Sequence, residues 1–264
     1  MHFKSLNGVV LHYQDLGPAE LPTLVFANSL GTDFRIWDGV VARLAERFRI
    51  VLYDKRGHGL SGLGAPPYAI DDHVADLAAL LDELAVEGAV VCGLSVGGLI
   101  AQGLYAARPD LVSGLVLSDT AHRIGSTELW DGRIAAIEAG GIDAIAEAIL
   151  ERWFSRVLRE NDPDAFAGWR HMLTRTPQDG YLGTCAAIRD ADFTEAARRI
   201  AVPTLCIVGA EDGATPPALM RETADLIPGA GYEVIEGAGH LPCIERPEAV
   251  AALIDAFTRE NGLA

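Results

Sequence analysis

The chain has 264 residues, half of them hydrophobic, and a mean hydropathy of +0.20, which is enough apolar material for one large α/β domain. Its 37 acidic residues outnumber 21 basic ones, and the net charge of −16 argues against nucleic acid and anionic membranes as partners. No apolar run is long enough to span a membrane and no secretory leader follows Met1, so we expect a cytoplasmic protein. The scattered cysteines, without a CxxC motif, agree with free thiols in a reducing compartment: Cys92, Cys185, Cys206 and Cys243.

Strand and helix patterns alternate along most of the chain. Asn7-Gly8 between two short apolar runs is typical of a β-hairpin. Further apolar runs alternate with amphipathic segments, which predicts parallel strands covered by helices on both faces. The predicted strands are 3–5, 9–13, 24–27, 50–53, 89–92, 114–117, 204–208 and 232–235, and the predicted helices are 37–48, 70–84, 97–107, 217–227 and 247–257. We therefore expect an α/β fold with an eight-stranded, mostly parallel sheet flanked by helices.

The alternation stops between residues 121 and 199, where the pattern predicts helices but no strand. The simplest interpretation is a core formed by residues 1–120 and 200–264, with 121–199 inserted as a helical cap. Such a cap would lie over the carboxyl end of the sheet, where open α/β sheets bind ligands.

A candidate nucleophile lies between a predicted strand and a predicted helix. The sequence Gly93-Leu94-Ser95-Val96-Gly97 has the pattern G-x-S-x-G. A sharp strand-to-helix turn needs glycines, because neighbouring backbone segments come too close for a Cβ atom. Ser95 would then be held in the open at the positive end of the helix.

Serine is a poor nucleophile unless a base takes its proton and an acid orients that base. His240 lies on a Gly-rich loop after the last predicted strand, whereas His122 and His171 lie in the predicted cap. For the acid, Asp212 is favoured over Asp119, because it lies in a Gly-x-x-Asp loop and gives the chain order Ser–Asp–His. Asp119, which ends the strand at 114–117, remains the alternative.

Residues 53–61, with the sequence YDKRGHGLS, contain two glycines and two cations. A phosphate-binding loop would need a helix N-terminus close behind it, and none follows. We therefore prefer a structural loop held by Asp54 and Arg56, with His58 in an architectural role.

Taken together, these motifs resemble those of the α/β-hydrolase superfamily. Ser95, Asp212 and His240 match its triad positions, and DKRGHGLS matches its D-x-R-G-x-G-x-S loop. Serine at the elbow argues against epoxide hydrolases and haloalkane dehalogenases, which carry aspartate there. Further motifs resemble the 3-oxoadipate enol-lactonases, among them Asn28-Ser29-Leu30-Gly31-Thr32, Arg123-Ile124-Gly125-Ser126 leading to Trp130, Glu151-Arg152-Trp153-Phe154, and Gly180-Tyr181 leading to Cys185. The chain departs from that pattern at Asp119, where asparagine is common, and at Leu241-Pro242-Cys243.

The resemblance implies that a serine hydrolase opens the enol-lactone of 3-oxoadipate through an acyl-enzyme on Ser95, in bacterial breakdown of protocatechuate and catechol. It implies no cofactor and no metal. The backbone N–H groups of Leu30 and Val96 are the expected oxyanion donors, since one follows the nucleophile and the other lies in the loop after strand 24–27. The expected partner is a small anionic lactone, and the sequence leaves a homo-oligomer open.

The substrate carboxylate needs a local cation in so acidic a protein. Arg133 is our candidate, because a guanidinium binds a carboxylate with two hydrogen bonds; an ion-paired or solvated helix residue is the alternative. Trp130 and Trp153 either line the pocket or pack the cap onto the core. Two other functions remain: a general carboxylesterase or haloperoxidase-like hydrolase, and a receptor of the same fold that binds a small lactone.

Overall fold

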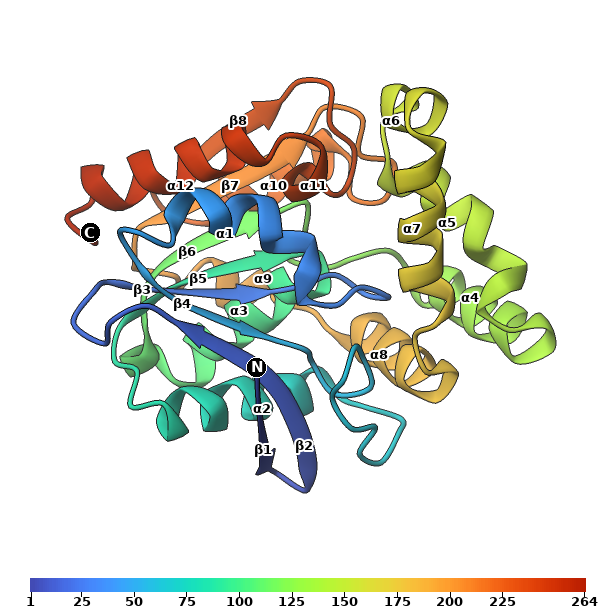
Figure 1. The fold of residues 1–264 in the computed structure, drawn as a ribbon, viewed down its shortest axis with the longest axis horizontal. Helices are drawn as coiled ribbons and strands as arrows, with labels where there is room; N and C mark the ends of the chain where they lie inside the picture. Colours follow the sequence, from blue (N-terminus) through green and yellow to red (C-terminus); the bar gives the residue numbers. More distant parts are fainter.

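A computed structural model describes all residues 1–264, and one sheet runs through its centre (Figure 1). The spatial order of the strands is β1-β2-β4-β3-β5-β6-β7-β8. Strand β2 pairs antiparallel with β1 and β4, and every other pair is parallel. The strands are β1 His2–Leu6, β2 Val9–Leu16, β3 Thr23–Ala27, β4 Arg49–Tyr53, β5 Ala89–Leu94, β6 Val112–Ser118, β7 Thr204–Gly209 and β8 Gly231–Ile235. The predicted eight-stranded, mostly parallel sheet is confirmed.

The first two strands form the predicted hairpin. Asn7 and Gly8 both have positive φ, +48° and +76°, as a two-residue turn matched to the sheet twist requires. Strand β2 is longer than predicted and continues to Leu16. Its second half carries no apolar run, and it is held instead by pairing with β4, from Tyr13 opposite Tyr53 to Leu16 opposite Ile50.

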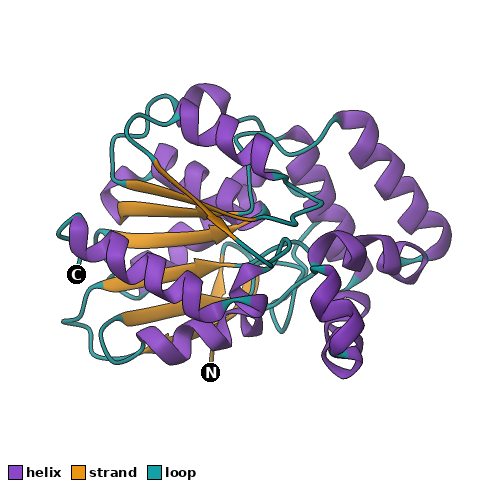
Figure 2. Cartoon of the chain, turned by 90° about the horizontal axis from the view of Figure 1, so that it is seen from above, coloured by secondary structure: helices purple, strands orange, loops and turns teal.

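Helices cover both faces of the sheet (Figure 2). Helix α1 packs against α12, and α2 packs against α3. The predicted helix 37–48 is wrong in its bounds, because α1 spans only Asp38–Leu44. A 3₁₀ turn, η1, precedes it at Phe34–Trp37. Helix α1 ends before residue 48 because residues 45–48 turn back into β4. These helices are η1 Phe34–Trp37, α1 Asp38–Leu44, α2 Ile70–Glu83, α3 Val96–Ala107, η2 Pro109–Leu111, α10 Pro217–Leu226, α11 Pro242–Glu245 and α12 Pro247–Glu260.

The connection from β6 to β7 is helical throughout. Its elements are α4 Thr127–Gly140, η3 Ile142–Ile145, α5 Ala146–Trp153, α6 Arg156–Asn161, α7 Pro163–Thr174, α8 Gln178–Asp190 and α9 Thr194–Ala197. Figure 1 shows α4 to α8 beyond one end of the sheet, and we call residues 127–190 the helical segment. None of the helices combines the length and the apolar character that crossing a membrane would need.

The helical segment shares its hydrophobic core with the sheet. Trp130, Leu150 and Leu173 belong to the same buried cluster as the central strands. Helix α8 also touches the loop after β4 directly, since a Cβ atom on Gly180 would lie 2.2 Å from the carbonyl oxygen of Gly57. Two residues without side chains thus bring these backbones together.

Candidate active site

Ser95 occupies a strained turn between β5 and α3. Its φ of +58° and ψ of −119° lie outside the regions that a serine ordinarily adopts. The turn fits only because its neighbours are glycines: a Cβ atom on Gly93 would lie 2.2 Å from the Gly97 oxygen, and one on Gly97 would lie 2.0 Å from the Ala27 oxygen. The Thr120 hydroxyl donates to the Ser95 carbonyl at 2.6 Å and helps to hold the turn.

His240 and Asp212 are brought together from the loops after β8 and β7. The His240 Nδ1 atom lies 2.9 Å from the Asp212 Oδ2 atom. The other carboxylate oxygen accepts hydrogen bonds from the backbone N–H groups of Ala214 at 2.7 Å and Thr215 at 3.0 Å. The backbone N–H of His240 donates to the Trp153 carbonyl at 2.8 Å, so the end of α5 fixes the histidine loop.

The Asp212 carboxyl is ionised, although it is buried. Burial by itself would raise its pKa, but the His240 side chain and the backbone donors hold the pKa below its ordinary value. A carboxylate only accepts hydrogen bonds, so Nδ1 of His240 carries the proton and Nε2 is free to act as a base. No hydrogen bond joins the Ser95 hydroxyl to His240 in this state, yet both residues line one cavity.

Asp119 has different partners. It is fully buried with a φ of +45°, and its Oδ1 atom accepts from the Gly209 N–H at 2.8 Å while its Oδ2 atom accepts from the Ser118 hydroxyl at 2.7 Å. Burial, together with the negative charge of Asp212, raises its pKa well above the ordinary value. Of the two acids, the geometry therefore pairs Asp212 with His240.

The loop after β3 and the first residue of α3 supply free backbone donors. Neither the N–H of Leu30 nor that of Val96 is used by another group of the chain, and Leu30 lines the cavity. The Gly31 N–H is already used, since it donates to Nε2 of His58 at 3.0 Å. Gly31 has a φ of +74°, and a Cβ there would lie 2.6 Å from the Leu173 side chain, so only glycine fits.

The cavity around Ser95 and His240 has a volume of about 60 Å³. Despite the net charge of −16, its walls contain two arginines, Arg133 and Arg152, and no carboxylate. Neither guanidinium forms an ion pair within the chain; Arg133 instead stacks on the Trp130 ring, 4.6 Å from its centre. The remaining walls are mainly apolar and aromatic: Leu30, Ile124, Leu129, Trp130, Ile149, Trp153 and Tyr181. This cavity suits a compact substrate that is partly apolar and carries a negative charge.

A larger cleft of about 780 Å³ lies between the loop after β3 and helix α7. None of Ser95, Asp212 and His240 reaches it. Size alone would favour this cleft, but only the smaller cavity contains a nucleophile beside a base, so we place the chemistry there.

One group of side chains converges closely enough to hold a metal ion: the ligand atoms of Asp119, Asp212 and His240 all lie within 4.8 Å of one another. Asp212 and His240 are hydrogen bonded to each other through those atoms, and Asp119 is committed to Gly209 and Ser118. The donor set fits an acid–base pair better than a set of metal ligands.

A family model described as "Alpha/beta hydrolase family" matches residues 24–253 of the chain. The chain belongs to the α/β-hydrolase family. This α/β-hydrolase is 34% identical over 261 residues to 3-oxoadipate enol-lactonase 2 of Acinetobacter baylyi, an alignment covering 98% of the chain and 97% of the relative. It is 27% identical over 268 residues to the non-heme chloroperoxidase of Streptomyces lividans, covering 96% and 97%. The crystal structure of the enol-lactonase from Burkholderia xenovorans LB400 has a TM-score of 0.94 and 38% identity, with 98% of this chain and 100% of that chain covered.

Two residues of this α/β-hydrolase site are not predicted by the sequence. Arg152 lines the cavity next to Trp153, but the sequence could not show which way its side chain points. Glu245, on α11, accepts hydrogen bonds from the backbone N–H groups of Gly239 at 2.7 Å and Ser155 at 3.1 Å, and so ties the histidine loop to the helical segment. Nothing in its sequence context distinguishes it from a solvated glutamate.

Proposed function

We propose that this protein is a serine hydrolase that opens the enol-lactone of 3-oxoadipate to 3-oxoadipate. The observation that carries the proposal is the cavity itself, which holds Ser95 and His240 beside two unpaired arginines and no carboxylate. The relative and the structure named as enol-lactonases support the same assignment. The step belongs to bacterial breakdown of aromatic compounds in the cytoplasm, where four free, buried cysteines are expected.

In the first half of the reaction, the Ser95 hydroxyl attacks the lactone carbonyl while Nε2 of His240 takes its proton. The ring C–O bond breaks and the ring oxygen leaves as an enolate, which receives the proton from His240 and tautomerises to a ketone. An enolate is a better leaving group than an alkoxide because its charge is delocalised.

In the second half, a water molecule attacks the acyl-enzyme with His240 again as the base, and Ser95 is released. The N–H groups of Leu30 and Val96 bind the oxyanion of both tetrahedral intermediates, and such a donor contributes about 3–4 kcal/mol to the lowering of the barrier. Asp212 holds His240 in the required tautomer throughout.

The two arginines give the cavity its preference for an anion. A guanidinium pairs with a carboxylate through two parallel hydrogen bonds, and neither Arg133 nor Arg152 has an acidic partner in the chain that would compete with the substrate. The aromatic walls contact the apolar part of the lactone ring.

The test compares two substrates and one variant. We expect kcat/KM for the enol-lactone to exceed that for p-nitrophenyl acetate by at least about 100-fold, the effect of one charged contact that only the lactone makes. Ser95→Ala should lose activity on both substrates by about 10⁴-fold or more, with an unchanged melting temperature.

A higher kcat/KM for the simple ester would indicate a general carboxylesterase. Turnover that ends after a few cycles would indicate a lactone receptor, and full activity of Ser95→Ala would refute the nucleophile.

A further inference from the structure

Lysine is rare in this chain. Of 21 basic residues only Lys4 and Lys55 are lysines. One of them is exposed to solvent and the other is buried. Lys4 lies at the surface and pairs with Glu83 at 2.5 Å. Lys55 is among the largest fully buried side chains of the protein, with 1% of its surface exposed. A buried ammonium is costly unless it is paired or hydrogen bonded.

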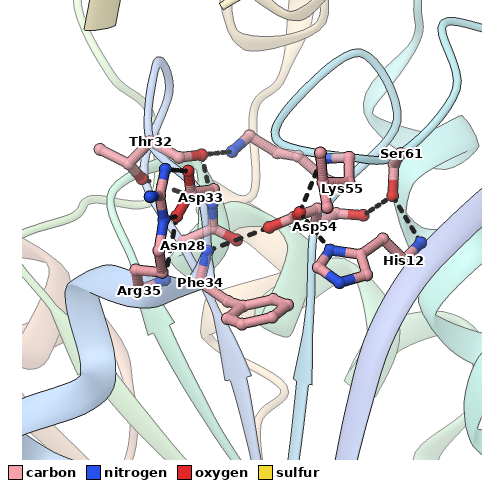
Figure 3. Close-up of polar contacts among 10 residues, drawn as sticks. His12, Asn28, Thr32, Asp33, Phe34, Arg35, Asp54, Lys55 and Ser61 are labelled. Atoms are coloured by element: carbon pink, nitrogen blue, oxygen red, sulfur yellow. Dashed lines mark hydrogen bonds and ion pairs between the residues drawn. The ribbon is translucent and has the colours of Figure 1, made fainter. Parts of the chain in front are cut away.

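No carboxylate forms an ion pair with Lys55. Its Nζ atom donates to the backbone carbonyl of Ser29 at 2.5 Å. It also donates to the backbone carbonyl of Thr32 at 3.4 Å (Figure 3). The neighbouring Asp54 carboxylate is committed elsewhere, because it accepts from the N–H groups of Phe34 at 3.0 Å and Leu60 at 2.9 Å and lies 2.7 Å from Nδ1 of His12. The ammonium is thus directed entirely at the loop after β3.

The Ser29 carbonyl belongs to the same peptide unit as the Leu30 N–H. A trans peptide is planar, and its C=O and N–H point in opposite directions. Holding the oxygen from one side therefore fixes the direction of the N–H on the other side. A positive charge on the oxygen also polarises the peptide, which makes the N–H a stronger donor.

Three further contacts hold this loop. The Thr32 hydroxyl donates to the Ser29 carbonyl at 2.9 Å, the Asn28 side chain donates to the Thr32 carbonyl, and the Gly31 N–H donates to His58. Among the groups that hold the Ser29–Leu30 peptide, only Lys55 carries a charge that titrates.

We propose that Lys55 is a positioning residue for the hydrolytic reaction: its ammonium aligns and polarises the Ser29–Leu30 peptide so that the Leu30 N–H binds the oxyanion. The inference rests on the proposed function, in which that N–H is an oxyanion donor. It assigns a role to the second residue of the DKRGHGLS loop, which otherwise looks like an isolated buried charge.

The charge state of Lys55 depends on groups from every element around it. Burial lowers the pKa of Lys55 to about 7, while the negative charges of Asp54 and Asp33 oppose that shift. His58, in its own loop, and His73, on α2, are both buried, and burial together with the Lys55 charge keeps their pKa values low, so they are neutral. Asp33 is paired with Arg35 at 2.6 Å. Lys55 is therefore charged below neutral pH and loses its charge as the pH rises through about 7.

The first experiment is Lys55→Met, which keeps the length of the side chain and removes the charge. With p-nitrophenyl acetate as the probe, we expect kcat to fall by about 10- to 100-fold, less than the loss of an entire oxyanion donor, while KM changes by less than about 2-fold. The melting temperature should not fall, since an apolar chain replaces an unpaired buried charge. The matched control is Lys4→Met, which should leave kcat unchanged.

The second experiment follows the wild-type protein and does not depend on a variant folding. Protein labelled with carbon-13 at the lysine ε-carbon gives two signals, and Lys4→Met identifies that of Lys55. We expect kcat to fall on the alkaline side with the same midpoint as the Lys55 titration, and we expect this alkaline loss to be absent in Lys55→Met.

A Lys55→Met kcat within about 2-fold of wild type would overturn the inference, as would a wild-type kcat that stays flat through the Lys55 titration. Ser95→Ala, assayed in parallel, separates this failure from failure of the proposed function. If Ser95→Ala is inactive and Lys55→Met is fully active, only the role of Lys55 is wrong; if Ser95→Ala is active, the proposed nucleophile is wrong.

Discussion

Asp119 and Asp212 are both buried beside His240, yet their surroundings shift their pKa values in opposite directions. Backbone donors and the imidazole hold the pKa of Asp212 below its ordinary value, whereas burial next to that charge raises the pKa of Asp119 well above it. Two carboxyl groups this close cannot both ionise easily, so each helps to define the state of the other.

The two aspartates predict a contrast between matched variants. Asp212→Asn should lower kcat by about 10⁴-fold, because an amide cannot hold His240 in the tautomer with Nε2 free. Asp119→Asn should lower kcat by less than about 10-fold, because the amide oxygen can still accept from the Gly209 N–H and because Asp212, not Asp119, is hydrogen bonded to His240.

Steady-state kcat of the two purified proteins, with circular dichroism to check folding, is the measurement. A large loss in Asp119→Asn with little change in Asp212→Asn would exchange the roles of the two acids.

At the scale of single residues, the sequence predicts best where the backbone constrains the side chain. The elbow motif locates Ser95 because its glycines are required by the turn, and strand ends locate His240 and Asp212. The directions of Arg152 and Glu245 depend on how α5 and α11 pack, which no local pattern encodes. The burial of Lys55 was equally invisible, since a lysine between Asp54 and Arg56 looks solvated in the sequence.

At the scale of elements, the cavity is formed where α4 and α5 meet the loops after β3 and β5. Helix α4 carries Trp130 and Arg133, and α5 carries Arg152 and Trp153, so each helix contributes one cation and one aromatic ring. Ser95 and His240 come from the core, whereas Arg133, Arg152 and their neighbouring tryptophans come from the helical segment.

This division predicts that removing Arg133 or Arg152 weakens binding of the charged substrate and leaves the rate of the chemical step unchanged. Arg133→Ala and Arg152→Ala should each raise KM for the enol-lactone by about 10- to 100-fold, the effect of one charged hydrogen bond, with no comparable change for neutral p-nitrophenyl acetate. Arg170→Ala is the matched control, since Arg170 lies on α7 in ion pairs with Asp143 and Glu147, outside the cavity.

KM values for both substrates in all three variants provide the check. If KM rises equally for the charged and the neutral substrate, the arginines support the cavity wall and do not bind the carboxylate.

The elements themselves were predicted from periodicity, because a buried parallel strand is a continuous apolar run. The predicted bounds are wrong where tertiary contacts, and not the local sequence, determine where an element ends. The second half of β2 has no apolar pattern and forms only because β4 is beside it, and α1 ends at Leu44 because the chain must reverse to enter β4. The path of the helices between β6 and β7 was beyond local patterns for the same reason.

At the scale of the whole molecule, apolar burial is extensive enough to protect every cysteine. Cys92, Cys185, Cys206 and Cys243 are all buried free thiols, and burial raises the pKa of each of them. Only a thiolate reacts readily with disulfide reagents, so neither charge state nor access favours reaction in the folded protein.

We therefore expect a thiol count that reports global unfolding. In the native protein at about pH 8, Ellman's reagent should modify none of the thiols within minutes, whereas in guanidinium chloride it should modify all four. The absorbance of the released thiolate measures both counts. Fast modification of one native thiol would show that its part of the core opens without global unfolding.

The contact between Gly57 and Gly180 bears on how such enzymes can be recombined. A helical segment transplanted from another protein would need a residue without a side chain at the position of Gly180, since even a methyl group there would collide with the backbone at Gly57. Gly57 lies two residues from Lys55 and next to His58. Both Lys55 and His58 are hydrogen bonded to the loop after β3. The helical segment is therefore not an interchangeable module: in a chimera with a larger residue at position 180, we expect the loop of Gly57, and with it the loop after β3, to be displaced.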